Sequence, residues 1–298
     1  MMGRSAAAGT EPPAAERDQA RAAYLVRRHV LESVGAALAG AGLEALLVKG
    51  AALAETVYRE PWTRPMSDID LVVHARDLGP ALGSLERAGA IVAPVPADRR
   101  WSHARMGERV LELPVGPIGW TVELHTEIDR IAPRPIPWSE VWTRSTYLED
   151  FSGALRVPCR EDHALLVILH ASLSDFAHPP AASDLTALWR AGIDEAAFAD
   201  RAEAWRLTVA SYLALAPRTS RGFAGASPEL VLRLCPPRWR LDLAARAIAA
   251  GRELGWRWTL RQASFRDDPA NWLGGLARYG AVRAAERLLL AGARGDRV

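Results

Sequence analysis

The sequence predicts an α/β protein in which a small mixed sheet is backed by helices and followed by a helical C-terminal part. Two observations predict this class. Short apolar runs of strand length alternate with helix-like patterns up to about residue 158. Beyond that point apolar residues recur at helical spacing, and no strand-like run follows Pro180. We therefore expect a disordered leader over residues 1–14, an α/β domain over 15–158 and a helical domain over 159–298.

Helices and strands are expected to alternate in the first part of the chain. Apolar residues at helical spacing indicate a helix over Ala15–Ala41, and Gly40 and Gly42 predict its end. The next elements are expected in this order: a strand Ala45–Val48, a helix Ala51–Tyr58, a proline-containing loop Glu60–Pro65, a strand Asp68–Val73, a helix Asp77–Ala88 and a strand Ile91–Val95.

The second part of the chain begins with strands and then turns helical. The turn-rich segment Pro114–Pro117 predicts that strands Val110–Leu113 and Trp120–Leu124 pair with each other. Leu155–Pro158 is expected as an edge strand, and Ser183 as the cap of a helix that runs to Trp189. The other helices are expected at Trp138–Trp142 (or a turn there), from Arg160 to His170, and at Glu195–Trp205, Thr208–Ala216, Leu241–Gly251, Trp256–Phe265 and Val282–Ala291.

The composition is that of an ordinary globular chain, with 49% hydrophobic and 24% charged residues. No apolar run approaches the ~20 residues of a membrane span, and Met1–Pro13 lacks the apolar core of a signal peptide. Cys159 and Cys235 lack the paired spacing of a zinc site or a disulfide framework. We expect a cytoplasmic protein that does not bind a membrane.

The net charge of +2 conceals an asymmetry. From Ser227 onward there are 13 arginines and 7 acidic residues, a net charge of +6, whereas the preceding part carries −4. A basic C-terminal part indicates a polyanionic partner such as nucleotide phosphates or RNA. Solvated arginine-rich helix faces explain the same asymmetry equally well.

Two carboxylates mark the strand over residues 68–73. Asp68 and Asp70 stand at positions i and i+2, so a strand points both to one face and turns Ile69 to the other. Two such carboxylates repel each other unless a cation lies between them. Mg²⁺ in phosphoryl-transfer sites is typically held by one or two carboxylates together with substrate phosphates.

A lysine and a glycine end the first strand. Lys49 is the only lysine among 37 basic residues, and it stands with Gly50 where a strand passes into a helix. Backbone N–H groups and the positive dipole end of a helix N-terminus favour a phosphate there. A compact ammonium is not interchangeable with arginine at such a place, so we predict that Lys49 and Gly50 hold phosphate.

These segments resemble a known family. Lys49-Gly50-Ala51-Ala52-Leu53, Tyr58, Arg64 and Ser67-Asp68-Ile69-Asp70-Leu71 are similar to the uncharacterised nucleotidyltransferase family of the DNA polymerase beta superfamily, and to AbiEii-type toxin nucleotidyltransferases. The resemblance covers about residues 25–190. Lys49-Gly50 replaces the superfamily's usual Gly-Ser, so the phosphate-loop serine is missing. The superfamily has a third carboxylate on a later strand, and Glu123 in Val122-Glu123-Leu124-His125 matches it; Glu127 is the weaker rival.

The resemblance implies a polymerase-beta-like sheet and a metal-dependent enzyme that moves an NMP from an NTP to a hydroxyl acceptor: a small molecule, a peptide or RNA. It implies that Asp68, Asp70 and Glu123 are catalytic and bind Mg²⁺, two ions in number. The residues that it implies for binding the NTP are Lys49, Gly50, Arg64 and Ser67. For Arg64 the alternative is an ion pair with Glu60.

Two other functions stay open: a toxin-like tRNA nucleotidyltransferase and a catalytically silent nucleotide-binding interaction protein. The sequence leaves undecided the acceptor, the preferred NTP, the oligomeric state and the roles of His103, His125 and His170.

Overall fold

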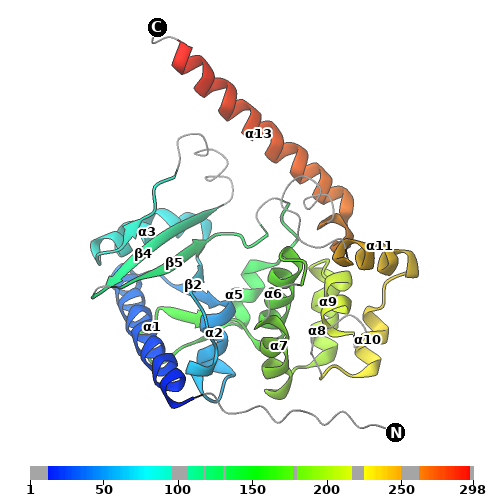
Figure 1. Cartoon of the computed structure of the whole chain (residues 1–298), viewed down its shortest axis with the longest axis horizontal. Coiled ribbons are helices and arrows are strands. Elements are labelled where there is room, and N and C mark those ends of the chain that lie inside the picture. Colours follow the sequence, from blue (N-terminus) through cyan, green and yellow to red (C-terminus); the bar gives the residue numbers. More distant parts are fainter. Residues whose placement is uncertain are drawn as a thin grey trace.

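A mixed sheet of seven strands lies between two layers of helices (Figure 1). The structure is a computed structural model that describes residues 13–95, 107–116, 118–129, 132–176, 180–216, 225–249 and 262–295. The strands, in their order across the sheet, are β3 (Ile91–Val92), β4 (Glu108–Val115), β5 (Ile118–His125), β2 (Asp68–Val72), β1 (Ala45–Val48), β7 (Leu155–Val157) and β6 (Thr146–Tyr147).

Strand β2 occupies the middle of the sheet. It pairs antiparallel with β1 and parallel with β5, and the register places Asp70 beside Glu123. β4 and β5 form the antiparallel pair that the sequence predicts. β7 pairs with β1 on one side and with β6 on the other, so the prediction that Leu155–Pro158 is an edge strand is wrong. The edge is β6, a strand of two residues, which is too short to show a periodicity.

One face of the sheet packs against α1 (Ala14–Gly40) and α3 (Leu78–Arg87). α1 ends where the sequence predicts, because Gly42 adopts the left-handed conformation, with φ of +67°. The strands send alternate residues to this face: Leu47, Ile69, Leu71, Val122 and Leu124, all fully buried. Each such side chain contributes on the order of 2 kcal/mol by leaving water. The alternation fixes which residues remain for the other face.

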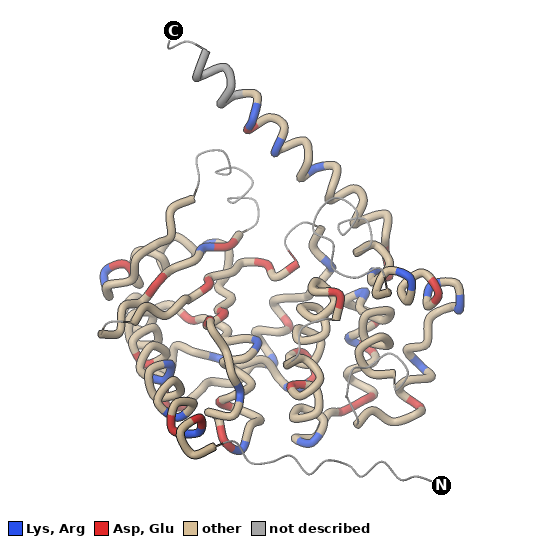
Figure 2. The backbone as a smooth tube through the Cα atoms, viewed as in Figure 1, with Lys and Arg blue, Asp and Glu red and all other residues tan. Residues whose placement is uncertain are grey.

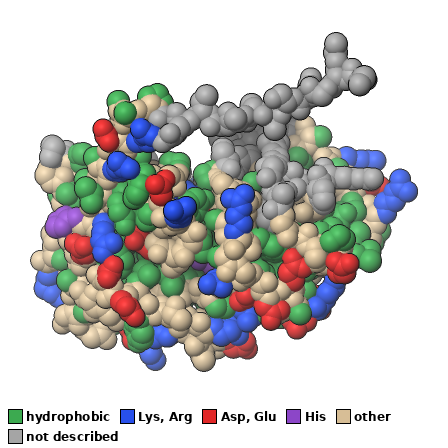
Figure 3. Space-filling model, turned by 90° about the horizontal axis from the view of Figure 1, so that it is seen from below, with side chains coloured by type: hydrophobic (Ala, Val, Ile, Leu, Met, Phe, Trp, Pro, Cys, Tyr) green, Lys and Arg blue, Asp and Glu red, His purple; other side chains and the backbone are tan. Residues whose placement is uncertain are grey.

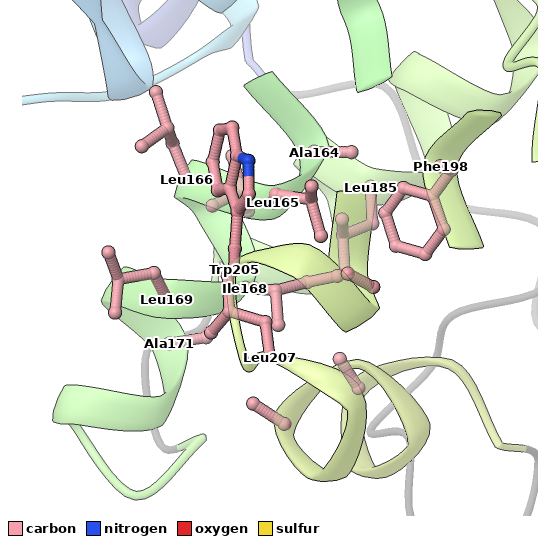
Figure 4. Close-up of a cluster of buried hydrophobic side chains, with 14 of the residues drawn as sticks. Ala164, Leu165, Leu166, Ile168, Leu169, Ala171, Leu185, Phe198, Trp205 and Leu207 are labelled. Atoms are coloured by element: carbon pink, nitrogen blue, oxygen red, sulfur yellow. The ribbon is translucent and has the colours of Figure 1, made fainter. Parts of the chain in front are cut away.

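The other face packs against α2 (Lys49–Thr56) and against helices that follow β5 in the chain. Leu46, Val48 and Val72 belong to this core together with α6 (Arg160–Leu173). Figure 4 shows Trp205, Phe198 and side chains of α6 inside it. The surrounding helices are α2 (Lys49–Thr56), α5 (Trp138–Arg144), α7 (Pro180–Arg190), α8 (Glu195–Ala204), α9 (Thr208–Leu215) and α10 (Pro228–Leu234). The short 3-10 turns are η1 (Pro61–Thr63) and η2 (Ala75–Asp77).

The C-terminal elements are α11 (Arg238–Ala249), η4 (Gln262–Phe265) and α13 (Pro269–Gly295), and α13 runs away from the body of the molecule (Figure 1). A buried ion cluster connects this region to the end of β5. Asp129 accepts hydrogen bonds from Arg134 and Arg266, each at 2.8 Å, and Arg266 also lies over the ring of Trp272. Trp272 is therefore part of the core, whereas Trp239 is 63% exposed.

Charged side chains occur on the C-terminal helices and over the rest of the surface (Figure 2, Figure 3). Arginines are spaced along α11 and α13 in Figure 2. On the face that Figure 3 presents, acidic and basic side chains are interspersed. No helix in the described ranges is long and apolar enough to cross a membrane.

Several predicted boundaries are wrong. The second helix begins at Lys49 rather than Ala51, and β4 continues through Pro114 and Val115, which were expected in the turn. Ser183 does not cap a helix, because α7 already begins at Pro180, whose carbonyl accepts the Ser183 hydroxyl. The helix expected over Val282–Ala291 is part of the longer α13. The expected leader and most of the helix expected at Trp256–Phe265 lie outside the described residues.

Candidate functional site

A cavity of about 450 Å³ opens where β2 and the start of α2 meet α6 and α7. Its polar side is formed by Lys49, Gly50, Arg64, Ser67, Asp68 and Asp70. The opposite side is formed by Val167, His170, Pro180, Ala181 and Asp184, and Pro65 and Met66 complete the wall. Six of the seven residues predicted from sequence therefore line one cavity.

The prediction that Asp68 and Asp70 share a face is confirmed. Both line the cavity, while Ile69 is buried on the opposite face of the sheet. Glu123 does not line the cavity, but it is the direct neighbour of Asp70 on β5. The parallel register thus brings the three predicted carboxylates close together on two adjacent strands.

A histidine joins the two neighbouring carboxylates. His125 Nε2 lies 3.0 Å from Asp70 Oδ1 and 3.4 Å from Glu123 Oε2. Asp70, Glu123 and His125 each offer a ligand atom, and these atoms lie within 4.8 Å of one another. Asp68 is not part of this group. His125 follows Glu123 by two residues on the same strand, so alternation alone could have placed it on the same side.

The electrostatics of the three carboxylates differ. Burial alone would raise the pKa of Asp70, but the bonds to His125 and Lys49 hold it well below its usual range. The contact with His125 is the main cause that lowers the pKa of Glu123. Burial raises the pKa of Asp68, and repulsion by Asp70 and Glu123 raises it further. Among the described residues, no side chain donates a hydrogen bond to Asp68, so its charge is the least compensated of the three.

Lys49 contacts an acid of the site directly. Its Nζ donates to Asp70 Oδ1 at 2.5 Å, and its side chain is 18% exposed. The residue has φ of +54°, a left-handed conformation that is uncommon outside glycine. This backbone turn begins α2 immediately after β1. The ammonium and His125 together balance the charge of Asp70.

Arg64 is held in a buried ion pair. Its Nε and Nη2 donate to the two carboxylate oxygens of Asp184, each at 2.8 Å, and Nη1 donates to the Pro65 carbonyl. Tyr58 also donates to Asp184, at 2.7 Å. The partner of Arg64 is thus Asp184 of α7 rather than Glu60. A Cβ on Gly50 would lie 3.1 Å from the guanidinium carbon, so this glycine lets Arg64 approach the start of α2.

The other sequence candidates have different places in the structure. Glu127 accepts from the Asp129 backbone N–H at 3.1 Å and from Trp138 Nε1 at 3.2 Å, and it does not join the acidic group. His170 lines the cavity, and His103 lies outside the described residues. Asp184 was not singled out from sequence, because nothing near it in the chain indicates its partner.

One of three comparisons with known proteins gives a match. Neither the curated proteins nor the solved structures that were searched give a match. Residues 14–217 match the model of a family described as uncharacterised nucleotidyltransferase, and this range includes the strands β1, β2 and β5 as well as α6 and α7. Because the match spans more than half of the 298 residues, the chain belongs to this uncharacterised nucleotidyltransferase family.

Proposed function

We propose that this protein is a metal-dependent nucleotidyltransferase that moves an NMP from an NTP to a hydroxyl acceptor. We also propose that its sheet is of the DNA polymerase beta type, related to the AbiEii-type toxin enzymes. The observation that carries the proposal is the placement of Asp68, Asp70 and Glu123 close together on two adjacent parallel strands, at a cavity that Lys49 also lines.

The donor atoms suit Mg²⁺. Three carboxylates provide the hard oxygen ligands that this ion prefers, and the poorly compensated charge of Asp68 favours a cation next to it. We assign Asp68, Asp70 and Glu123 as the ligands, and His125 as the residue that orients Asp70 and Glu123, because imidazole is a softer ligand. When bound, two Mg²⁺ ions supply charge neutralisation of the triphosphate and polarisation of the reacting oxygens.

The reaction that the site supports is an in-line displacement. The acceptor oxygen forms a bond to the α-phosphorus, the bond between that phosphorus and the α,β-bridging oxygen breaks, and pyrophosphate leaves. Glu123 accepts the proton of the acceptor hydroxyl, directly or through water. Catalysis of this kind depends mainly on positioning and on charge neutralisation.

The phosphates are held at the rim of the cavity. We propose that Lys49 exchanges its contact with Asp70 for phosphate oxygens, and that the Gly50 backbone and Ser67 hold the same group. All the guanidinium nitrogens of Arg64 already have partners. Arg64 therefore adds positive charge to this end of the cavity from its fixed place on Asp184.

Label transfer tests the proposal. The protein is incubated with Mg²⁺, fractions of a cell extract and each NTP labelled either at the α- or at the γ-phosphate. We expect one fraction to take up α-label only. Asp70→Asn and Asp68→Asn should abolish uptake, whereas Asp18→Asn, at an acid with a 76% exposed side chain, should leave it unchanged. Uptake of γ-label would make the enzyme a kinase, and equal uptake by Asp70→Asn would place the site elsewhere.

RNA is the acceptor that a specific observation favours. Arginines are spaced along α11 and α13, and Trp239 is exposed on α11 (Figure 2). Arginine and exposed aromatic rings bind phosphates and stacked bases respectively. An electrophoretic mobility shift with bulk tRNA tests this acceptor; a salt-independent or absent shift would favour a small molecule or peptide. Nucleotide binding with no transfer to any fraction would support the catalytically silent alternative. A cytoplasmic location stays a prediction.

A further inference from the structure

We propose that the η4 turn fixes the corner at the end of α6, and that Gln262 of this turn is thereby a positioning residue for the cavity wall that α6 and α7 form. The corner consists of Asp175 and Phe176, which follow Ser174, the C-cap of α6. The naming of an NTP as the ligand of the cavity rests on the proposed function. The contacts of the corner do not, because they are observed in the structure itself.

Both residues of the corner have an unusual backbone conformation. The angle φ is +54° at Asp175 and +55° at Phe176. Aspartate is one of the residues that visit the left-handed region, but a bulky side chain such as phenylalanine does so rarely, and residues with a Cβ visit it singly rather than in succession. Such a conformation persists only where the surrounding structure holds it. The corner therefore requires contacts that offset the cost of its backbone.

The η4 turn provides one contact for each of the two residues. Gln262 Nε2 donates to Asp175 Oδ1 at 2.6 Å, and both side chains are buried. The ring of Phe265 meets the ring of Phe176 edge-on, with 5.4 Å between the centroids. Gln262 and Phe265 stand at the two ends of a single 3-10 turn. Because the two contacts are adjacent along both segments, a movement of the corner would break both of them.

The turn can hold the corner because it is itself anchored to the body of the molecule. Phe265 is fully buried in a small core with residues of α9 and α11. Arg266 donates to Asp129 at 2.8 Å, and Asp267 accepts two backbone N–H groups at the start of α9, at 2.8 and 2.9 Å. The turn is thus fixed to α9 and to the segment that follows β5, so it does not move freely with the corner.

The corner decides where α7 begins, and α7 lines the cavity. α6 contributes Val167 and His170 to the cavity wall, and α7 contributes Pro180, Ala181 and Asp184. Pro180 follows the corner by four residues, so a corner that relaxed to the right-handed region would redirect the chain just before this wall. The three carboxylates of the site lie on β2 and β5 instead. We therefore expect Gln262 to act on the shape of the cavity and not on its acids.

Hydrogen–deuterium exchange of the nucleotide-free protein tests the contact. Gln262→Ala should speed the exchange of backbone N–H groups in α7 and at the end of α6 several-fold. Asp175→Ala should do the same, whereas Asp175→Gly should stay near the wild type, because glycine adopts the left-handed region without support. Ser152→Ala is the matched control: Ser152 has φ of +57° but is exposed in the turn before β7, and its substitution should leave both helices unchanged.

The pair of substitutions at position 175 separates positioning from the mere loss of a hydrogen bond. Both remove the carboxylate that Gln262 binds, and they differ in the cost of the left-handed backbone. Asp175→Gly should also rescue Gln262→Ala. Equal exchange in Asp175→Ala and Asp175→Gly would overturn the proposal, as would wild-type exchange of α7 in a folded Gln262→Ala. If Gln262→Ala does not fold alone, the double substitution with Asp175→Gly must fold and exchange like Asp175→Gly, and its failure would overturn the proposal as well.

Kinetics give a second readout. Gln262→Ala should raise KM for the NTP several-fold and change kcat less, because the wall contacts the nucleotide while the carboxylates stay in place. Asp175→Gly should restore KM in the double substitution, since the two changes act on one contact. A fall in kcat with unchanged KM would contradict the assignment. Absence of any transfer activity would count against the proposed function alone, since the exchange experiment uses no nucleotide.

Discussion

The buried pair of Arg64 and Asp184 allows the sharpest prediction about stability. The two side chains are 7% and 3% exposed, and Tyr58 also donates to the carboxylate. Asp184→Asn keeps the shape of the side chain but removes its charge, so the Arg64 guanidinium stays buried without a counter-ion. Removing one partner of a buried pair costs about 3–5 kcal/mol of the free energy of unfolding.

Urea unfolding followed by tryptophan fluorescence measures this loss. The control is Glu32→Gln, which removes the partner of Arg28 in an exposed pair along α1, and such pairs contribute about 0.5 kcal/mol or less. Arg64→Met combined with Asp184→Asn removes both charges and should recover about half or more of the loss, because no isolated charge is then buried. If Asp184→Asn costs no more than Glu32→Gln, the pair is not the buried anchor that the structure describes.

The remaining predictions concern the carboxylates and the lysine. Glu123→Gln should retain NTP binding but lower turnover by about 10²-fold or more, whereas Glu127→Gln should leave turnover nearly unchanged; the reverse result would refute our choice of third carboxylate. Lys49→Ala should weaken NTP binding and slow transfer together. Lys49→Arg should recover less than about half of the lost rate, because a planar guanidinium does not replace a compact ammonium. Full activity of Lys49→Arg in steady-state kinetics would refute this expectation. Burial raises the pKa of Glu127 from 4.5 to about 7. Between pH 4.5 and pH 7 the folded protein therefore binds more protons than the unfolded chain, and the free energy of unfolding falls as pH rises. Glu127→Gln should lack this fall, on the order of 2–3 kcal/mol, and identical pH profiles of the two proteins in urea unfolding would contradict the shift.

The sequence pattern predicted the shared strand face of Asp68 and Asp70, because this depends only on neighbouring residues. A strand alternates faces with a period of two residues, so Asp68 and Asp70 could be placed together from sequence alone. The fold class followed in the same way, and the structure confirms a mixed sheet with helices on both faces. The roles of Lys49, Gly50 and Ser67 in binding NTP stay predictions, although all three line the cavity.

Contacts between distant segments could not be predicted. Arg64 and Asp184 are 120 residues apart, and no residue near either one indicates the other. The position of β7 inside the sheet depends on β6, which has only two residues. His125 was within reach of prediction, since it shares a strand face with Glu123, but its contact with Asp70 depends on the register between β2 and β5.

The charge of the three carboxylates explains why basic residues lie around them. The sheet supplies three carboxylates that repel one another, and such a group is stable only when cations lie beside it. In the structure Lys49 and His125 compensate Asp70. The helical layer supports a further basic residue of the cavity, because Asp184 of α7 holds Arg64. The three acids of the site therefore come from the sheet, and the placement of Arg64 depends on α7. A substitution of Asp184 that leaves the fold intact can thus alter the charge of the cavity wall without touching a substrate.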